Sequence, residues 1–219
     1  MNVPDLTPAA LAGTKVLVVG LGPTGLSCAR HLHAHGATVA VTDSRDAPPA
    51  LETLRSELPD VALILGGFDE PAFAAADVIV VGPGLPLTTP AVAKAIAAGT
   101  PVEGDIELFA QAVRAPVVGI TGTNGKSTVT TLLGQMARTA GLRTGVGGNL
   151  GDPVLTLLAD DVELYVVELS SFQLETTHSL ALVTATILNL SPDHMDPVSY
   201  THLRAHETIH AISYAVFCL

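Results

Sequence analysis

The stretch Thr121-Gly122-Thr123-Asn124-Gly125-Lys126-Ser127-Thr128 follows the apolar residues 116–120 and precedes a helical pattern. A buried strand that ends in a glycine-rich turn, with a helix starting at Lys126, directs backbone N–H groups and a helix N-terminus at one point in space. Such a point favours an anion. Lys126 can add a charge for the outer phosphates of a nucleotide, and the Ser127 hydroxyl is placed to hold a bridging magnesium ion. The stretch therefore predicts a phosphate-binding loop.

The spacing differs from the standard Walker A motif, which needs a glycine five positions before Gly125. Ile120 stands there, and glycines occur instead at Gly119 and Gly122. The alternative is a glycine-rich turn with a solvated Lys126. The strand, the Gly-Lys-Ser-Thr run and the helix together favour a relative of the P-loop.

Composition limits the classes of protein to which the chain can belong. It has 219 residues, of which 48% are hydrophobic and 14% charged, enough for one large or two ordinary globular domains. A net charge of -11, with only ten Lys and Arg, argues against nucleic acid or an anionic membrane as partner. No long apolar segment or signal sequence is evident, and two cysteines make no disulfide framework. The cysteine count favours a reducing cytoplasm. We also expect a monomer.

The first half of the chain begins with a nucleotide-binding pattern. Residues 15–20 read as a strand, Gly20-Leu21-Gly22-Pro23-Thr24-Gly25 as a tight turn opening a helix, and residues 38–42 as a second strand that ends in Asp43. Asp43 lies near the separation at which an acid grips a ribose hydroxyl. The pattern fits a dinucleotide pocket, a pocket for another nucleotide, or a turn that only packs the helix on the sheet.

Strands and helices alternate through the rest of this half. The apolar runs lie at 61–65, 78–81 and 101–102, and the helical patterns at 50–58, 90–98 and 105–113. This alternation predicts an α/β fold with a parallel sheet covered on both faces. Gly82-Pro83-Gly84 follows a strand, at the edge where ligands bind in such sheets. The pattern restarts at the phosphate loop, so we place a domain boundary near residue 114.

The second half adds acidic and polar residues after strands. Its helix continues to residue 140 and stops at Gly141, and residues 145–149 read as a second glycine-rich turn. Strands at 164–167 and 185–188 run into Glu168 and Asn189. A carboxylate at the end of a strand beside a P-loop commonly holds magnesium, although Glu168 could be a solvated strand end. His194 follows the last strand and could join the same crevice or simply be a hydrogen-bonded loop residue.

The character of the chain changes at Pro197. His206-Glu207-Thr208-Ile209-His210 matches the H-E-x-x-H pattern of zinc proteases. The match is five residues long in a chain whose other signals indicate a nucleotide, so we do not favour a metalloprotease.

Several motifs, taken in order, resemble those of the Mur ligases. They are residues 121–128, Gly147-Gly148-Asn149, residues 168–175 and residues 189–196. The Ser-Ser-Phe-Gln-Leu-Glu stretch at 170–175, residues 104–109 and the Gly20 turn resemble the D-glutamate-adding branch of that family. The likeness covers about residues 15–196.

The resemblance implies an ATP-dependent amide ligase with ATP and Mg²⁺ as cofactors. Its substrates would be UDP-N-acetylmuramoyl-L-alanine and D-glutamate, joined through an acyl phosphate in peptidoglycan precursor synthesis. The implied ATP-binding residues are Gly122, Thr123, Asn124, Gly125, Lys126, Ser127 and Thr128, and the implied magnesium ligands are Ser127, Glu168 and His194. Lys126 and His194 would be catalytic. The implied substrate-binding residues are Pro23, Thr24, Gly25, Asp43, Ser44, Arg45, Gly84, Asn149 and Ser170.

The resemblance also implies a domain division, and this sequence departs from the family pattern in two ways. Residues 1–114 would form a Rossmann-like UDP-substrate domain and 115–196 an incomplete ATPase domain with a mostly parallel sheet. The family carries a carbamylated metal-binding lysine after the Asp-His-Met-Asp motif and a third, C-terminal domain. Here the last lysine is Lys126. We expect residues 197–219 to be foreign sequence from a frameshift or read-through, and the chain to be inactive because it is truncated.

Three other functions remain open at this stage. A ligase such as folylpolyglutamate synthase shares a similar phosphate loop, but residues 170–175 and the Gly20 domain count against it. A non-catalytic module could bind a UDP-sugar only. An NAD-dependent oxidoreductase is the weakest alternative, because nothing beyond the glycine turn suggests hydride chemistry.

Overall fold

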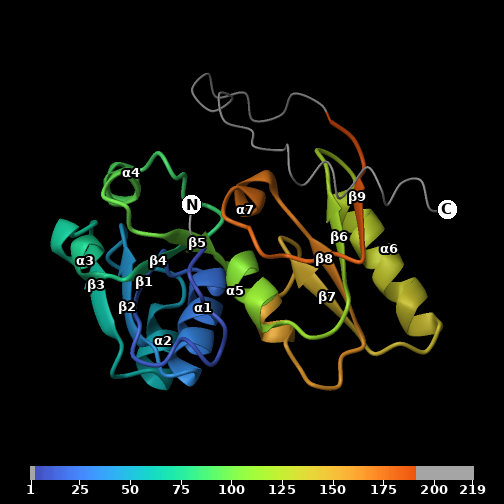
Figure 1. The fold of residues 1–219 in the computed structure, drawn as a ribbon, viewed down its shortest axis with the longest axis horizontal. Helices are drawn as coiled ribbons and strands as arrows, with labels where there is room; N and C mark the ends of the chain where they lie inside the picture. The colour runs from blue at the N-terminus through green and yellow to red at the C-terminus, as the bar shows by residue number, and fades with distance from the viewer. Residues whose placement is uncertain (1–2, 191–219) are drawn as a thin grey trace. The chain divides into compact units, whose positions relative to one another are not determined.

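The computed structural model describes residues 3–190, and the chain divides into two compact units. Of the described residues, unit 1 comprises 3–113 and 176–180, and unit 2 comprises 114–175 and 181–190. Each unit holds a parallel sheet with helices packed on it (Figure 1). The expected α/β class, with a Rossmann-like first part and a mostly parallel second sheet, is confirmed.

Unit 1 is built on five parallel strands in the order β3-β2-β1-β4-β5. The strands are β1 (Lys15–Val19), β2 (Thr38–Asp43), β3 (Ala62–Leu65), β4 (Val78–Val81) and β5 (Val102–Gly104). The helices between and after them are α1 (Pro23–Ala34), α2 (Leu51–Glu57), α3 (Glu70–Ala75), α4 (Pro90–Ala97) and α5 (Asp105–Ala112). The strand order reverses between β1 and β4, and this is the point at which open α/β sheets bind ligands.

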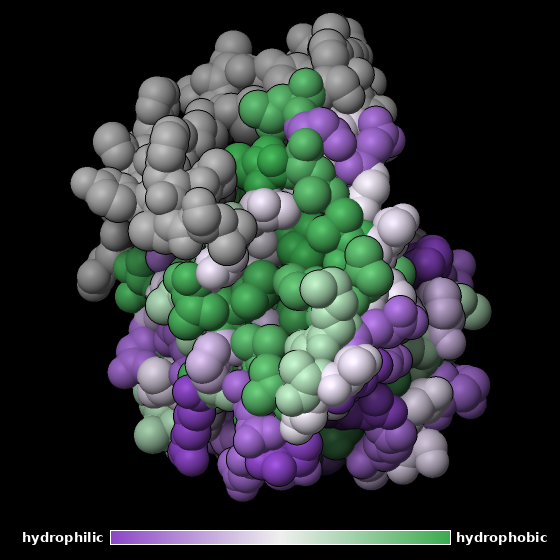
Figure 2. Space-filling model, turned by 90° about the vertical axis from the view of Figure 1, so that its right-hand side faces the viewer, coloured by the Kyte–Doolittle hydropathy of each residue, from purple (hydrophilic) through white to green (hydrophobic). Residues whose placement is uncertain are grey.

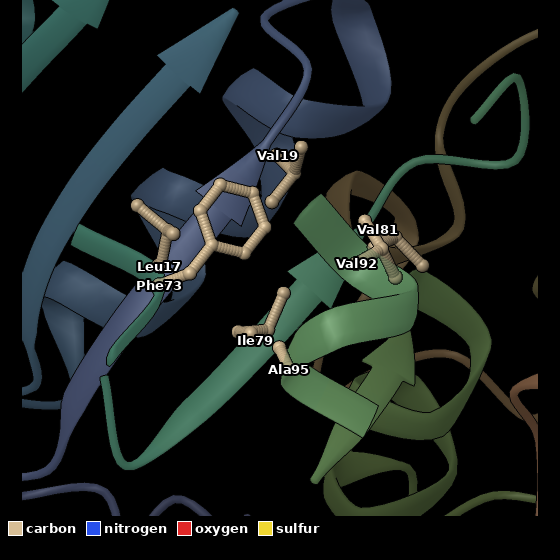
Figure 3. Packing of buried hydrophobic residues seen from close by; sticks show 7 residues of the cluster. All are labelled: Leu17, Val19, Phe73, Ile79, Val81, Val92 and Ala95. Carbon is tan, nitrogen blue, oxygen red and sulfur yellow. The ribbon is translucent and has the colours of Figure 1, made fainter. Parts of the chain in front are cut away.

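Alternate residues of the central strands cover the two faces of this sheet. Leu17 and Val19 of β1 pack with Phe73 of α3 and Val92 of α4, and Ile79, Val81 and Ala95 complete the cluster (Figure 3). The intervening residues Val16 and Val18 are equally buried on the opposite face, where α1 and α5 pack. A strand buried on both faces reads as a continuous apolar run, which explains the composition of β1 and β4.

Unit 2 has four parallel strands in the order β7-β8-β6-β9. These are β6 (Val117–Thr121), β7 (Thr144–Gly148), β8 (Leu164–Glu168) and β9 (Thr184–Ile187). Helix α6 (Lys126–Thr139) packs on β6, β7 and β8, a 3-10 turn η1 (Val154–Leu157) packs on β7, and α7 (Ser171–Glu175) follows β8. Among the described residues, β9 is an edge strand beside β6.

Large apolar side chains lie on the surface of unit 2. Leu132 and Met136, one helical turn apart on α6, are 54% and 59% exposed, and Val183 before β9 is 61% exposed. Figure 2 shows apolar surface gathered on the side where α6 and β9 lie. Among residues 3–190, no helix is both long and apolar enough to cross a lipid bilayer.

Candidate functional site

The turn after β1 brings glycines and a helix N-terminus together in unit 1. Gly20 has φ +98°, and a Cβ on Gly25 would overlap the Gly20 carbonyl oxygen, so both positions require glycine. Pro23 occupies the first turn of α1, and this helix has no capping side chain. Its N-terminal N–H groups are therefore available to an anion at the reversal of the strand order.

Asp43 closes the same turn from the end of β2. Its carboxylate accepts the Leu21 N–H at 2.7 Å, the Arg45 N–H at 2.9 Å, and the Arg45 guanidinium at 2.7 and 2.8 Å. The Arg45 side chain, and then the Leu21 and Arg45 amides, lower the pKa of this buried carboxyl to about 2. Asp43 is thus ionised and fully hydrogen-bonded within the protein, and Arg45 is the exposed member of the pair.

The other residues expected at this site lie around the same sheet edge. Thr24 is on the first turn of α1, Ser44 is exposed directly after β2, and Gly84 is exposed in the turn that follows β4. Because β1, β2 and β4 are neighbouring parallel strands, their carboxyl ends lie at one edge. Unit 1 therefore gathers Pro23, Thr24, Gly25, Asp43, Ser44, Arg45 and Gly84 at that edge.

The glycine-rich turn that we expect to bind phosphate, called the phosphate loop below, lies between β6 and α6. Gly122 and Gly125 have φ +134° and +84°, and α6 starts at Lys126 without a capping side chain. The Lys126 ammonium donates to the carbonyl oxygens of Gly122 at 2.7 Å and Thr123 at 3.1 Å. The lysine therefore lies over the loop. Ser127 and Thr128 are exposed in the first helical turn, where backbone N–H groups lack intrahelical partners.

Glu168 lies beside the loop, on the neighbouring strand. It pairs in register with Ile120, one residue before the loop begins. Glu168 is 2% exposed, and one of its carboxylate oxygens accepts the Asn149 amide at 2.8 Å. The other oxygen is buried and has no hydrogen-bond partner among residues 3–190. A buried carboxylate oxygen without a partner costs free energy unless a cation or donor meets it. Glu168 is therefore suited to a metal ion.

Asn149 and Ser170 are both held by neighbours in unit 2. The Asn149 N–H donates to the Glu168 carbonyl at 2.9 Å, in addition to the side-chain contact with the same residue. Ser170 and Gln173 exchange hydrogen bonds of 3.1 to 3.2 Å, a capping box for the short helix α7. Asn149 is thus at the candidate metal site, and the Ser170 hydroxyl already has a structural partner.

Some of the expectations concern residues after 190, which the structure does not describe. His194, expected to be catalytic and a metal ligand, lies outside the described residues, as do the H-E-x-x-H pattern and residues 197–219. Among residues 3–190, no group of three or more His, Cys, Asp or Glu side chains is arranged to hold a metal ion. Glu168 lies on the strand next to the loop but is not part of such a group.

Sequence reasoning gave Asn189 no role, although the structure places it against the phosphate loop. Its side chain accepts the Asn124 N–H at 2.9 Å and donates to the Asn124 carbonyl at 2.8 Å. The available signal was an amide residue directly after a strand that flanks the loop.

Two family models match the sequence. Residues 14–104 match the N-terminal domain of MurD-like Mur ligases, and residues 120–217 match the Mur ligase middle domain. The second match extends beyond residue 196, where we expected the likeness to stop.

Two curated relatives carry the same name. The chain is 52% identical over 198 residues to the UDP-N-acetylmuramoylalanine–D-glutamate ligase of Marinobacter nauticus, covering 90% of this chain and 44% of the relative. It is 57% identical over 187 residues to the ligase of the same name from Nitrosococcus oceani, covering 85% of this chain and 41% of the relative. The chain thus spans less than half the length of these relatives.

Solved structures agree on the fold. The MurC UDP-N-acetylmuramate-alanine ligase of Thermotoga maritima superposes with a TM-score of 0.54 at 18% identity, covering 92% of this chain and 47% of that one. An MPL ligase from Neisseria meningitides gives a TM-score of 0.53 at 24% identity, with 84% and 63% coverage. At these identities the likeness shows the fold alone.

Proposed function

This chain belongs to the Mur ligase family, and from that membership we propose that it carries the nucleotide-binding parts of an ATP-dependent amide ligase. The proposed reaction adds D-glutamate to UDP-N-acetylmuramoyl-L-alanine in peptidoglycan precursor synthesis. The names of the curated relatives support this choice of substrates. ATP would bind unit 2 and the UDP end of the substrate unit 1.

The partner-free oxygen of Glu168 is the observation that carries the proposal. This buried atom belongs to Glu168, which lies on the strand next to the phosphate loop and pairs in register with Ile120. Asn149 satisfies the other oxygen and fixes the direction of the carboxylate. A phosphate loop with one unsatisfied buried carboxylate beside it suits a metal-bound nucleoside triphosphate.

The residues present fit a magnesium ion. Ser127 and Glu168 would hold it, and His194 would contribute to a second ion. When bound, magnesium neutralises charge on the transferred phosphoryl group. Lys126 would add a further positive charge, directed at the outer phosphates from the start of α6.

The proposed chemistry has two balanced steps. A carboxylate oxygen of the alanyl group attacks the γ-phosphorus of ATP, the bond to the β-phosphate oxygen breaks, and ADP leaves. The amine nitrogen of D-glutamate then attacks the acyl carbon, loses a proton, and displaces inorganic phosphate to leave the amide. Both steps depend on alignment and charge stabilisation, which the N–H groups at the start of α6 and Lys126 are suited to supply.

The turn after β1 would take the uridine nucleotide. The uncapped N-terminus of α1 and the exposed Arg45 guanidinium offer donors for a diphosphate. Asp43 is occupied by Arg45 and Leu21. We therefore propose that Asp43 holds Arg45 in place for the ligand. To contact a ribose hydroxyl, the Asp43 carboxylate would have to give up a hydrogen bond from Leu21 or Arg45.

A UDP-sugar-binding module without catalysis is the alternative. The turn in unit 1 favours it, because the residues that hold that turn, Leu21, Asp43 and Arg45, all belong to unit 1. The two functions differ in whether a triphosphate binds.

Titration calorimetry tests the proposal. We expect the chain to bind UDP-N-acetylmuramoyl-L-alanine and, with magnesium, a non-hydrolysable ATP analogue. Lys126→Ala should weaken the analogue about tenfold or more, since a charge-assisted hydrogen bond is lost, and leave the UDP-substrate affinity unchanged. Lys94→Ala, which removes an exposed lysine of α4 paired with Glu70, is the matched control. Binding of the UDP-substrate with no binding of the analogue would favour the module.

A further inference from the structure

Asn189 extends the β6–β9 pairing beyond the end of both strands. The Leu188 N–H donates to the Thr121 carbonyl at 3.0 Å, and the Thr123 N–H donates to the Asn189 carbonyl at 3.2 Å. The Asn189 side chain then continues the pairing with both backbone groups of Asn124, at 2.9 and 2.8 Å. The first half of the phosphate loop is thus attached to the chain after β9, 65 residues away.

We propose that Asn189 is a positioning residue that holds the phosphate loop in its binding conformation, an inference that rests on the proposed function. The contact with Asn124 is called the Asn189 clamp below. It acts on the nucleotide through the loop and does not itself touch the reacting atoms.

An asparagine suits this position for a chemical reason. Its amide carries one acceptor and two donors at the tip of a short side chain, so it can pair with an N–H and a C=O of one residue at once. Aspartate could accept from the Asn124 N–H but could not donate to the carbonyl. Alanine could do neither. The reciprocal pair also fixes which way the Asn189 amide points, because the opposite orientation would face donor to donor.

Gly122 permits the close approach that the clamp requires. Its φ is +134°, and an added Cβ would lie 3.1 Å from the backbone nitrogens of Leu188 and Asn189. Those distances are shorter than ordinary contacts of a Cβ. The glycine therefore lets the loop lie against the chain after β9, which Asn189 then holds.

The clamp divides the loop amides into two groups. The N–H groups of Thr123 and Asn124 already donate to Asn189. The N-terminus of α6, from Lys126 onward, has no capping side chain. We infer that the phosphates take the amides at the start of α6, and that Thr123 and Asn124 shape the loop instead of donating N–H groups to ATP.

Two measurements on the full chain test the role of Asn189. The first is the hydrogen-exchange rate of the Asn124 amide without nucleotide, which does not depend on ATP binding. The second is the calorimetric affinity for a non-hydrolysable ATP analogue with magnesium. The variants are Asn189→Ala, which removes both side-chain bonds, and Asn189→Asp, which keeps the acceptor only. Thr184→Ala, at an exposed position at the start of β9, is the control.

We expect Asn189→Ala to raise Asn124 exchange about tenfold, as losing a hydrogen bond of ordinary strength should, and to weaken the analogue about fivefold or more. Asn189→Asp should protect the Asn124 amide yet still weaken the analogue, because the carboxylate faces the Asn124 carbonyl. Thr184→Ala should change neither quantity.

The outcomes separate this inference from the proposed function. Unchanged Asn124 exchange in Asn189→Ala would overturn the clamp, whatever the nucleotide does. Faster exchange with unaltered analogue affinity would overturn the positioning role. If the unaltered chain binds no analogue, the proposed function fails and the positioning role with it, while slow Asn124 exchange would still support the contact.

Discussion

The Asp43 carboxylate accepts hydrogen bonds from two residues of its own unit, Leu21 and Arg45. Four donors from Leu21 and Arg45 meet its two oxygens, and its pKa falls to about 2. A carboxyl whose folded pKa lies below its unfolded value stabilises the fold above that unfolded value. This contribution is lost as the pH falls from about 4 toward 2.

Asp43→Asn should therefore lower the free energy of unfolding at pH 7 by about 1–2 kcal/mol, since charged hydrogen bonds are replaced and Arg45 is half-exposed. The difference from the unaltered chain should shrink as the pH falls toward 2. Denaturant unfolding between pH 2 and pH 7 measures both effects. Asp46→Asn, at an exposed position three residues on, serves as the control. A loss of stability that is the same at every pH would contradict the assigned cause.

A second buried carboxyl, Glu103 on β5, behaves in the opposite way. Burial and the nearby Glu107 raise its pKa to about 8. One of its oxygens is buried and finds no hydrogen-bond partner within the described part of the chain. Burial also opposes the charge of Glu107, but hydrogen bonds from Ser179, the His178 amide and Gln111 hold the pKa of Glu107 below its usual value. Glu103 is thus the protonated member of the pair at neutral pH. The approach of His178 Nε2 to it, at 3.5 Å, is then a contact with a neutral acid.

Glu103→Gln should change the pH dependence of stability. The folded state of the unaltered chain keeps a proton that the unfolded state releases, so its stability falls as the pH rises from about 4.5 to about 8. The variant lacks this loss and should gain stability relative to the unaltered chain across that window. Thermal unfolding at several pH values measures it, with the exposed Glu52→Gln as control. Parallel curves for Glu103→Gln and the unaltered chain would refute the raised pKa.

At this scale the sequence could predict where the residues of a local motif lie on the strands and helices. Lys126 and Ser127 begin a helix after a glycine turn, and Glu168 ends a buried strand, as expected. The role of Asn189 could not be predicted, because it depends on β9 lying next to β6. Asp43 was expected to bind the ligand. Its pairing with Arg45, two residues further on, could not be predicted, because no spacing rule shows that such a pair forms.

Strand β7 was not recognised in the sequence because three of its five residues are glycine. We read residues 145–149 as a glycine-rich turn, but Thr144–Gly148 is a strand. A Cβ at Gly145 would meet the Tyr165 ring, and one on Gly148 would meet the Glu168 carbonyl oxygen. The glycines allow β7 to lie against crowded neighbours, so the usual apolar signature of a strand is missing.

Gly148→Ala should lower the free energy of unfolding of unit 2. The loss should exceed the cost of placing an alanine at positive φ, because the new methyl group also meets Glu168. Gly141 provides the comparison, because its φ is +93° and nothing lies within 4 Å of an added Cβ. Gly141→Ala should cost about 1 kcal/mol. Gly148→Ala should cost about 2 kcal/mol or more, because the new methyl group also displaces the neighbouring strand. Equal losses in denaturant unfolding would mean that β7 tolerates the methyl group.

The remaining helices and strands differ in how well they could be predicted from the sequence. The strand at 78–81 was predicted with its observed bounds. Helices α1 and α6 each follow a glycine, and α4 starts at Pro90. Helix α3, Glu70–Ala75, was not predicted. Six residues are too few to establish a helical period, and packing of Phe73 against Leu17 and Ile79 stabilises it instead.

For the molecule as a whole, alternation of strands and helices predicted the parallel sheet of unit 1, and the resemblance to the Mur ligases implied the mostly parallel sheet of unit 2. Strand order was not predictable from that alternation, because β9 returns to the side of β6 opposite β8. The apolar surface of α6 was not predicted either, since Leu132 and Met136 fit the pattern of a buried helix face.

That surface should promote association of chains at high concentration. Leu132→Lys combined with Met136→Lys should lower the self-association, because each change removes an exposed apolar side chain and adds a charge. Sedimentation velocity over a concentration series measures it. Gln135→Lys, between them on the same helix, adds charge without removing apolar area. If Gln135→Lys were as effective as the double variant, charge and not apolar contact would explain the effect.

The five residues Thr176–Leu180 have a consequence for any attempt to express the halves separately. The polypeptide leaves unit 1 at residue 113, returns at 176 and departs again at 181. A gene stopped after residue 113 would lack the His178 and Ser179 amides that donate to Glu107, leaving a buried anion short of two donors. A gene begun at residue 114 would carry those amides without their acceptor. Fragment complementation, with both pieces made in one cell, is therefore the sound way to divide this protein.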